Sequence, residues 1–161
     1  MVFARYFTIL LLLTTSCKQT DIRFIEAASH SSLKKERLGE SIYYIEFPPN
    51  MFVEESRGKE GQLGYGLWLL DSINRYTGPS GFIEIEHGRP HGWEPDCDRY
   101  IEKAYTKILE RATKWKICKA ETSKYFSAVA FHSNLILTAR SPTKTGLDSM
   151  ISIIATLSQV P

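Results

Sequence analysis

The segment LILTARSPTKTGLDSMISIIATL (residues 135–157) passes from a strand pattern to a helix pattern. LILTARS is rich in β-branched and apolar residues, which favour a strand. Ser141 then precedes Pro142, and proline suits the first position of a helix because its missing N–H would have no partner there. We therefore predict a strand followed by a helix that Ser141 caps. The predicted buried stripe is Leu147, Met150, Ile151, Ile154 and Leu157.

Further strands are predicted on the N-terminal side of this segment. SKYFSAVAFH (123–132) joins LILTARS through a tight hairpin at Ser133-Asn134. SIYYIEFP (41–48) alternates in polarity and ends at a Pro-Pro bend, because proline cannot continue a ladder. MFVEES, LGYGLWLLDSI and GFIEIEHG (51–56, 63–73 and 81–88) complete the predicted strands, with a turn at Gly58 and Gly61.

Between residues 97 and 115 the apolar positions recur at the spacing of one helix face. Asp96, after Pro95, is a suitable N-cap. The stripe comprises Cys97, Tyr100, Ile101, Ala104, Tyr105, Ile108, Leu109, Ala112 and Trp115. The predicted fold is therefore α+β, an antiparallel β-sheet with two amphipathic helices packed on it.

The N-terminus carries an export signal. MVFARYF has one cation at Arg5, TILLLL is a short apolar core, and TTS supplies small residues before Cys17. The apolar run is too short to cross a bilayer, since a spanning helix needs about 20 residues. LTTSC (13–17) resembles the lipobox of bacterial lipoproteins, with Thr14 where the pattern usually has a larger aliphatic residue. The resemblance implies that Cys17 becomes the lipidated first residue of the mature chain; the alternative is an ordinary secretory signal.

Three segments follow from this interpretation: a signal peptide (1–16), a polar tether (17–39) and a single domain (40–161). Removal of Arg5 with the signal lowers the formal net charge from +2 to +1, which is close to neutral. Basic residues are interspersed with acids, so the chain has no predicted nucleic-acid stripe. Lys18, rather than aspartate, follows the anchor, which by resemblance to enterobacterial sorting implies an outer-membrane location facing the periplasm.

The predicted domain resembles the Mog1/PsbP-like fold. IEFPPNMFVEES near its start and LILTARSPTKTGLDSMISIIATL at its end carry the resemblance. Members of that fold are mostly small binding, assembly or chaperone modules, so the resemblance implies a binding function. It transfers no functional residue, because fold alone does not determine function.

The loop EIEHGRPHGWEPDCD (84–98) holds the densest set of chemically active side chains. Its histidines and Cys97 are ligand types that zinc accepts. However, Gly88, Pro90 and Gly92 predict a loop, in which residues four apart need not converge. We predict no metal and no cofactor here; the alternatives are a polar connection and a partner-binding loop that presents Arg89, His91 and Trp93.

The sequence predicts no enzyme. It contains no Gly-x-Ser-x-Gly elbow, and Cys118 with His132 has no local support as a catalytic pair. Glu84 and Glu86 are expected on the exposed side of a strand, and Gly64-x-Gly66 lacks the rest of a phosphate-binding pattern.

Cys97 and Cys118 present two alternatives. Oxidising compartments favour a disulfide between them. A helix from residue 97 to about 114 would separate the two cysteines by more than the roughly 7 Å that a disulfide allows between Cα atoms. The bond and a pair of buried thiols both stay open.

Two functions fit these features. The first is a lipid-anchored protein-binding or assembly module that engages an envelope protein. The second is an immunity lipoprotein that blocks a toxin delivered to the periplasm, with the Arg89, His91 and Trp93 loop as the inhibitory element.

Overall fold

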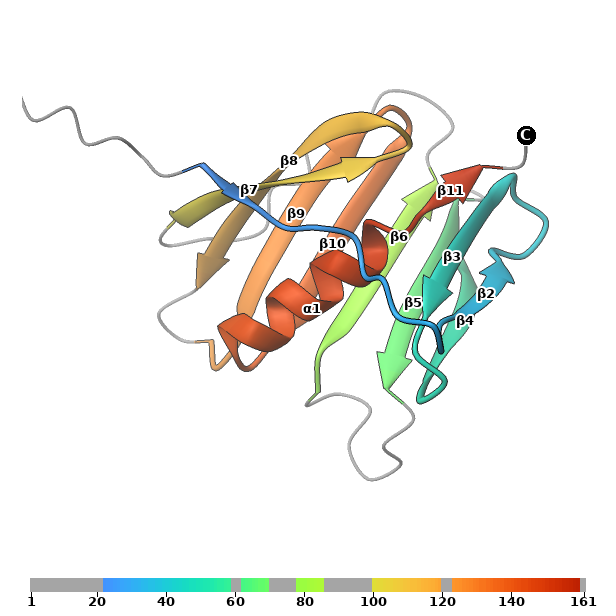
Figure 1. The fold of residues 1–161 in the computed structure, drawn as a ribbon, viewed down its shortest axis with the longest axis horizontal. Coiled ribbons are helices and arrows are strands. Elements are labelled where there is room, and N and C mark those ends of the chain that lie inside the picture. Colours follow the sequence, from blue (N-terminus) through green and yellow to red (C-terminus); the bar gives the residue numbers. More distant parts are fainter. Residues whose placement is uncertain (1–21, 59–61, 70–77, 86–99, 120–122, 160–161) are drawn as a thin grey trace, which may run out of the picture.

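The computed structural model describes residues 22–58, 62–69, 78–85, 100–119 and 123–159 of the 161-residue chain. These residues form eleven strands and one helix, α1 (Lys144–Ile154) (Figure 1). The strands are β1 (Arg23–Phe24), β2 (Lys34–Arg37), β3 (Tyr43–Phe47), β4 (Met51–Arg57), β5 (Leu63–Leu69), β6 (Ser80–Ile85), β7 (Tyr100–Ile108), β8 (Arg111–Lys119), β9 (Phe126–His132), β10 (Leu135–Ser141) and β11 (Ser158–Gln159).

Eight strands form one mixed sheet in the order β1-β7-β8-β9-β10-β6-β5-β4. The pair β1 and β7 is parallel, with Phe24 opposite Tyr105, and the other pairs in this sheet are antiparallel. A second sheet of three strands has the order β11-β3-β2.

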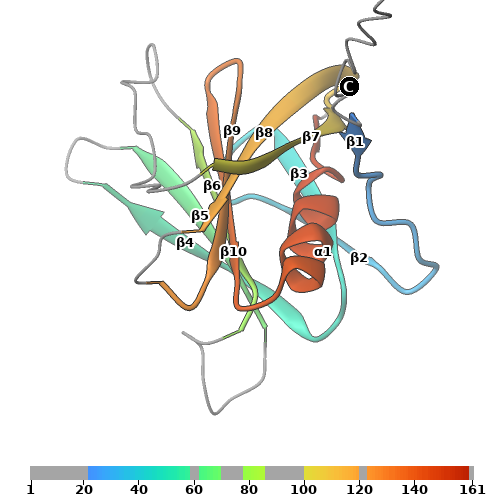
Figure 2. The same ribbon diagram turned by 90° about the vertical axis from the view of Figure 1, so that its left-hand side faces the viewer.

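The helix and the small sheet form a second layer over one face of the large sheet (Figure 1). Helix α1 contacts β10, β6 and β9 of the large sheet and β3 of the small one. Figure 2 shows α1 lying to one side of the large sheet, next to β10. At Gly81 of β6 the approach is close, because a Cβ atom there would lie 2.9 Å from the Met150 sulfur. Glycine at this position lets the helix approach the sheet.

One hydrophobic core fills the space between the layers. Alternate residues of β5, β6, β8 and β10 point into it, as the two-residue period of a strand requires. Trp115 is fully buried, and its indole N–H donates to the Thr106 hydroxyl at 2.9 Å. The largest other buried side chains include Tyr65, Phe47, Leu38, Ile45 and Leu67.

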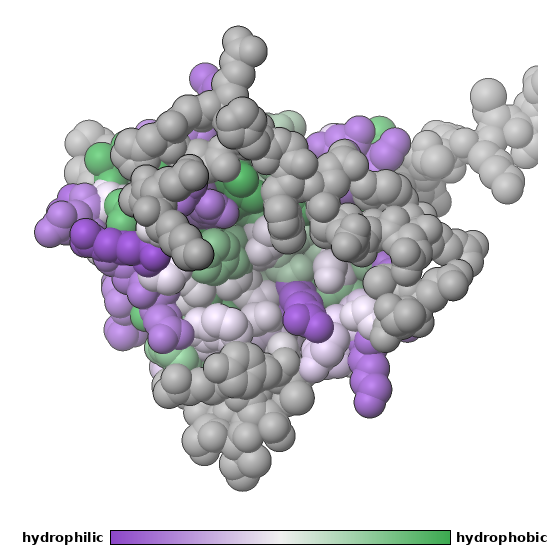
Figure 3. Space-filling model, turned by 180° about the vertical axis from the view of Figure 1, so that it is seen from behind, coloured by the Kyte–Doolittle hydropathy of each residue, from purple (hydrophilic) through white to green (hydrophobic). Residues whose placement is uncertain are grey.

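The opposite face of the large sheet is turned away from α1 (Figure 3). By the same alternation it carries Phe82 of β6 and Thr138 and Arg140 of β10. Arg140 lies over the Tyr125 ring at 4.0 Å from its centroid. This face is therefore chemically mixed, with aromatic, hydroxyl and cationic groups.

The predicted helix at residues 97–115 is wrong. Residues 100–119 form the antiparallel hairpin of β7 and β8, in which Ile108 pairs with Arg111. The inward residues follow a period of two, since Ala104, Thr106 and Ile108 are buried on β7. β-Branched and aromatic residues favour this conformation. Asp96 lies outside the described residues.

The predicted α+β class is wrong for the same reason. The described chain is mostly β-sheet with one helix, and its large sheet is mixed rather than antiparallel. The element order on which the resemblance to the Mog1/PsbP-like fold depends is therefore not observed.

The segment predicted as a tether contains two strands, as far as it is described. β1 pairs with β7 and β2 pairs with β3, while Leu38 is fully buried in the core. These strands form through pairing with segments elsewhere in the chain, and no local periodicity in the sequence predicts them.

The predicted C-terminal helix is confirmed, with its start shifted. Ser141 ends β10, and the N-cap is Thr143, whose hydroxyl accepts from the Gly146 N–H at 3.1 Å. Ser141 accepts from the Thr143 N–H at 3.2 Å instead. The predicted stripe residues are all buried, with Leu157 just beyond the helix.

Candidate functional site

Most residues that the sequence singles out lie outside the described residues. These are Cys17, Cys97 and the loop residues Arg89, His91 and Trp93. Their predicted roles stay predictions. Cys118 is described, and it lies on β8 with 1% of its surface exposed.

Cys118 is disulfide-bonded. Its partner lies outside the described residues, where both other cysteines are found. In the β7–β8 ladder Cys118 stands opposite Tyr100. The geometric objection to a bond with Cys97 depended on a helix, and residues 100–119 are strands instead.

The structure does not bring Cys118 and His132 together. In the β8–β9 register Cys118 pairs with Ser127, and His132 lies on the other face of β9 by alternation. His132 is 6% exposed, and its Nδ1 forms a 2.7 Å hydrogen bond with the Thr113 hydroxyl. Burial, with a contribution from the Arg111 charge, lowers the pKa of His132. The hydrogen-bonded pair of Thr113 and His132 is therefore a satisfied polar contact inside the core.

A groove of about 640 Å³ is present among the described residues. Its walls come from β1 and the segment that follows it, the β7–β8 turn, strands β2 and β3, and the chain from the end of α1 through β11. This volume falls within the range of roughly 300–1,000 Å³ that ligand pockets span.

The groove combines apolar surface with charges of both signs. Phe24 is 54% exposed along it, and Leu109 of the β7–β8 turn also lines it. Lys35 lies 3.8 Å from Glu46 across β2 and β3. Lys107 pairs with Glu110 at the opposite wall, where both side chains are well exposed.

The β7–β8 turn is strained. Leu109 and Glu110 both have positive φ, at 46° and 64°. Two-residue hairpin turns require this geometry, which asparagine and glycine adopt at the least cost. Leu109 and Glu110 both line the groove, so the strained turn forms part of its wall.

Thr156 fixes the wall at the end of α1. Its hydroxyl accepts from the Glu46 N–H at 2.9 Å and lies within hydrogen-bond distance of the Ile153 carbonyl, at 2.7 Å. The Ser158 hydroxyl, two residues later, is buried and has no hydrogen-bond partner in the described part of the chain. Other atoms of Ser158 line the groove.

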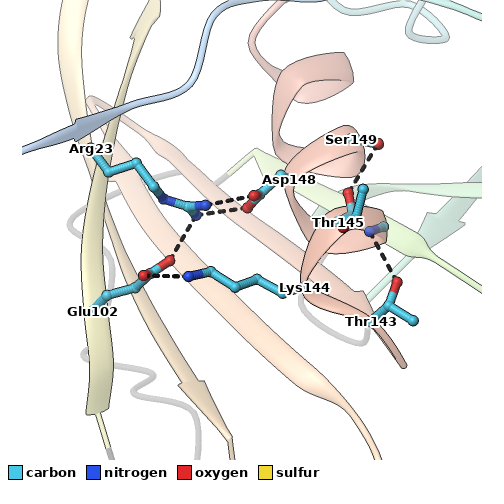
Figure 4. A network of polar contacts seen from close by, with 8 residues as sticks. Arg23, Glu102, Thr143, Lys144, Thr145, Asp148 and Ser149 are labelled. Atoms are coloured by element: carbon cyan, nitrogen blue, oxygen red, sulfur yellow. Dashed lines mark hydrogen bonds and ion pairs between the residues drawn. The ribbon is translucent and has the colours of Figure 1, made fainter.

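An ion-pair network holds the N-terminal wall (Figure 4). Arg23 of β1 donates two hydrogen bonds to Asp148 of α1, at 2.5 and 2.7 Å, and lies 2.8 Å from Glu102 of β7. Lys144 reaches the same Glu102 at 2.7 Å. The Asp148 hydrogen bonds and the two carboxylates raise the pKa of Arg23, with burial acting in the opposite direction.

Two backbone hydrogen bonds extend this attachment along the chain. The Ile25 N–H donates to the Tyr105 carbonyl at 2.8 Å, and the Ala28 N–H donates to the Ser152 carbonyl at 2.9 Å. Residues 23–28 are therefore held against both β7 and α1.

No family model and no curated protein matches the chain. Among the described residues no group of three or more His, Cys, Asp or Glu side chains is placed to hold a metal ion. None of their helices has the length and apolar content needed to cross a membrane.

Sequence reasoning missed the groove because its walls come from distant segments. Residues 24–28 and 155–159 meet there although more than 120 positions separate them. The available signal was IRFI (22–25), which holds three large apolar residues between mostly polar or small neighbours.

Proposed function

We propose that the protein is a membrane-anchored lipoprotein of the cell envelope, whose domain binds a segment of another protein in the groove between the two sheets. Cys17, at the end of the lipobox-like LTTSC, would carry the lipid. Lys18 after it favours the outer membrane, with the domain in the periplasm. The groove is the single observation that carries the binding function.

Two edge strands favour an extended protein segment as the occupant of the groove. β1 is the terminal strand of the large sheet and β11 is terminal in the small one, within the described part of each. Both strands line the groove. Terminal strands offer unpaired N–H and C=O groups, which an extended segment can satisfy by strand addition.

The side chains of the groove suit a mixed sequence. Phe24 and Leu109 offer apolar contact, while Lys35 and Glu110 can pair with charges of either sign on the partner. Charged residues at a rim select a partner more than they add affinity. An apolar centre with charged borders is the usual composition of a protein interface.

Site-specific crosslinking in the native membrane tests this proposal. A photoreactive residue at Lys35 or Glu110 should crosslink one defined protein, because both positions line the groove. The same residue at Thr145 or Ser149, which are exposed on α1, should crosslink none. Equal crosslinking from all four positions, or none from the groove, would contradict the proposal.

Purified partner then allows a quantitative test. Ala27→Trp places a large side chain in the groove and should weaken binding at least tenfold, whereas Thr145→Trp on α1 should leave it unchanged. If the partner proves to be an exported hydrolase whose activity the lipoprotein blocks, the function is immunity. If it is a resident envelope protein, the function is assembly. Unchanged binding by Ala27→Trp would remove the groove from either function.

A further inference from the structure

The end of β1 and the residues after it present two side chains of different chemistry to the groove. Phe24 and Glu26 are exposed and line it, whereas Ile25 between them is half-buried. The Ile25 N–H donates to the Tyr105 carbonyl, so the pairing with β7 continues past the end of β1. Side chains two positions apart in an extended segment lie on the same side. Phe24 and Glu26 are therefore neighbours along one wall of the groove.

Glu26 is the charged residue of this groove that lacks a counter-charge. The charged side chains that line the groove are three glutamates and two lysines. Lys35 lies 3.8 Å from Glu46, and Lys107 pairs with Glu110. Glu26 forms no ion pair and no side-chain hydrogen bond within the part of the chain that the structure describes. The lining therefore has one negative charge in excess, and it belongs to Glu26.

This excess charge favours a basic group in the occupant. An acidic group would compete with Glu46 for Lys35, or with Glu110 for Lys107. A basic group meets no such competition at Glu26. Attraction between opposite charges also strengthens where a cleft partly excludes water.

The main chain beside Glu26 is open to a partner. Ile25 bonds to β7, and the Ala28 N–H donates to the Ser152 carbonyl of α1. Between them, Glu26 and Ala27 form no main-chain hydrogen bond with any described residue. Their N–H and C=O groups can therefore bond to the main chain of an extended segment, as in strand addition. A small cation would leave these groups to water.

We propose that the segment bound in the groove is extended and carries a lysine or arginine beside Glu26, with an apolar residue two positions away beside Phe24. This inference rests on the proposed function, because it names the chemistry of the segment that the groove binds. The basic side chain pairs with the Glu26 carboxylate, and the apolar one covers Phe24, which is 54% exposed. An extended segment matches this spacing, since its own side chains on one side are also two positions apart.

Selection from a library of displayed heptapeptides tests this pattern while the partner is unknown. The protein purified from cells is immobilised, and the peptides that bind are sequenced. We expect enrichment of lysine or arginine at one position and of apolar residues two positions away. The same selection on Glu26→Lys should enrich aspartate or glutamate in place of the basic residue.

Matched variants make the selection specific. Glu40→Lys is the control for charge, because Glu40 is an exposed acid that does not line the groove. This variant should select the same peptides as the wild type. Phe24→Ser should retain the preference for a basic residue and lose the preference for the apolar one. Thermal unfolding checks that each variant is folded.

An exchange of charges between protein and peptide measures the contact directly. Replacement of the basic residue of an enriched peptide by glutamine should weaken binding about two- to fivefold, which is the size of an exposed ion pair. Replacement by glutamate should weaken binding to the wild type further and strengthen binding to Glu26→Lys. Such a reversal requires that the two positions interact.

Enriched peptides without a basic residue, or the same preferences in Glu26→Lys and the wild type, would overturn this proposal and leave the groove as a binding site. Failure of the proposed function is read separately from Ala27→Trp, which places a large side chain in the groove. Peptides that bind Ala27→Trp as well as the wild type, or a selection that enriches no peptide, would overturn the proposed function as well. The two failures are therefore distinguishable.

Discussion

His132 shows how a single buried group links stability to pH. Burial lowers its pKa, so the folded state holds the ring neutral where the unfolded chain begins to bind a proton near pH 6.5. The unfolded state therefore gains protons first as the pH falls, and stability decreases below about pH 6.5. His132→Gln should flatten the urea-unfolding free energy between pH 7 and 5. A wild-type free energy that stays constant over this interval would contradict the assignment.

Cys118 provides a second test at the residue scale. We predict Cys97 as its disulfide partner, because only two residues lie between Cys97 and Tyr100, which stands opposite Cys118. Lipidation of Cys17 would leave no other cysteine. A crosslink that closes a loop of about 20 residues contributes about 3 kcal/mol, so Cys97→Ala should lower the unfolding free energy by about that amount.

Peptide mapping without reduction identifies this bond directly. The peptide that contains Cys118 should be joined to the peptide that contains Cys97. A peptide joined to Cys17 would contradict both the pairing and the lipid anchor. Treatment with a reductant before mapping supplies the control.

At the scale of a single element, one substitution in the β7–β8 turn should stabilise the protein. Glu110 has a φ of 64°, which glycine adopts at lower cost than glutamate. We expect Glu110→Gly to raise the unfolding free energy by about 1 kcal/mol, although it removes the exposed contact with Lys107. Glu54→Gly is the control, because Glu54 is an exposed position inside β4, where glycine is unfavourable. This variant should have a lower unfolding free energy than the wild type. Loss of stability in Glu110→Gly would show that the turn is not strained.

This turn also explains the principal error of prediction. The turn residues Leu109 and Glu110 are not Gly, Asn or Asp, so the sequence lacks the usual signal of a two-residue hairpin. The flanking apolar residues fit both a helical and a strand period. Strands with clear turns, such as those joined at Ser133-Asn134, were predicted correctly. So was α1, where Leu147, Met150 and Ile151 follow a helical spacing up to its end.

At the scale of the whole molecule, long-range pairing limits what a sequence can reveal. β1 forms by pairing with β7, about 80 positions away, and the groove appears only when β11 reaches β3. Residues 22–39 follow no sustained strand or helix period, so their local pattern does not predict this pairing. The export signal predicted before Cys17 is different, because the pattern of such a signal is local in the sequence.

The lipid on Cys17 is the claim on which this account depends most. The most direct measurement is the intact mass of the protein extracted from membranes, together with its distribution between membrane and soluble fractions. We predict a chain that begins at Cys17 with the added mass of the lipid, and a Cys17→Ser protein that is found in the soluble fraction after a salt wash. An unmodified Cys17 in the membrane fraction, or a salt-resistant membrane association of Cys17→Ser, would contradict the account.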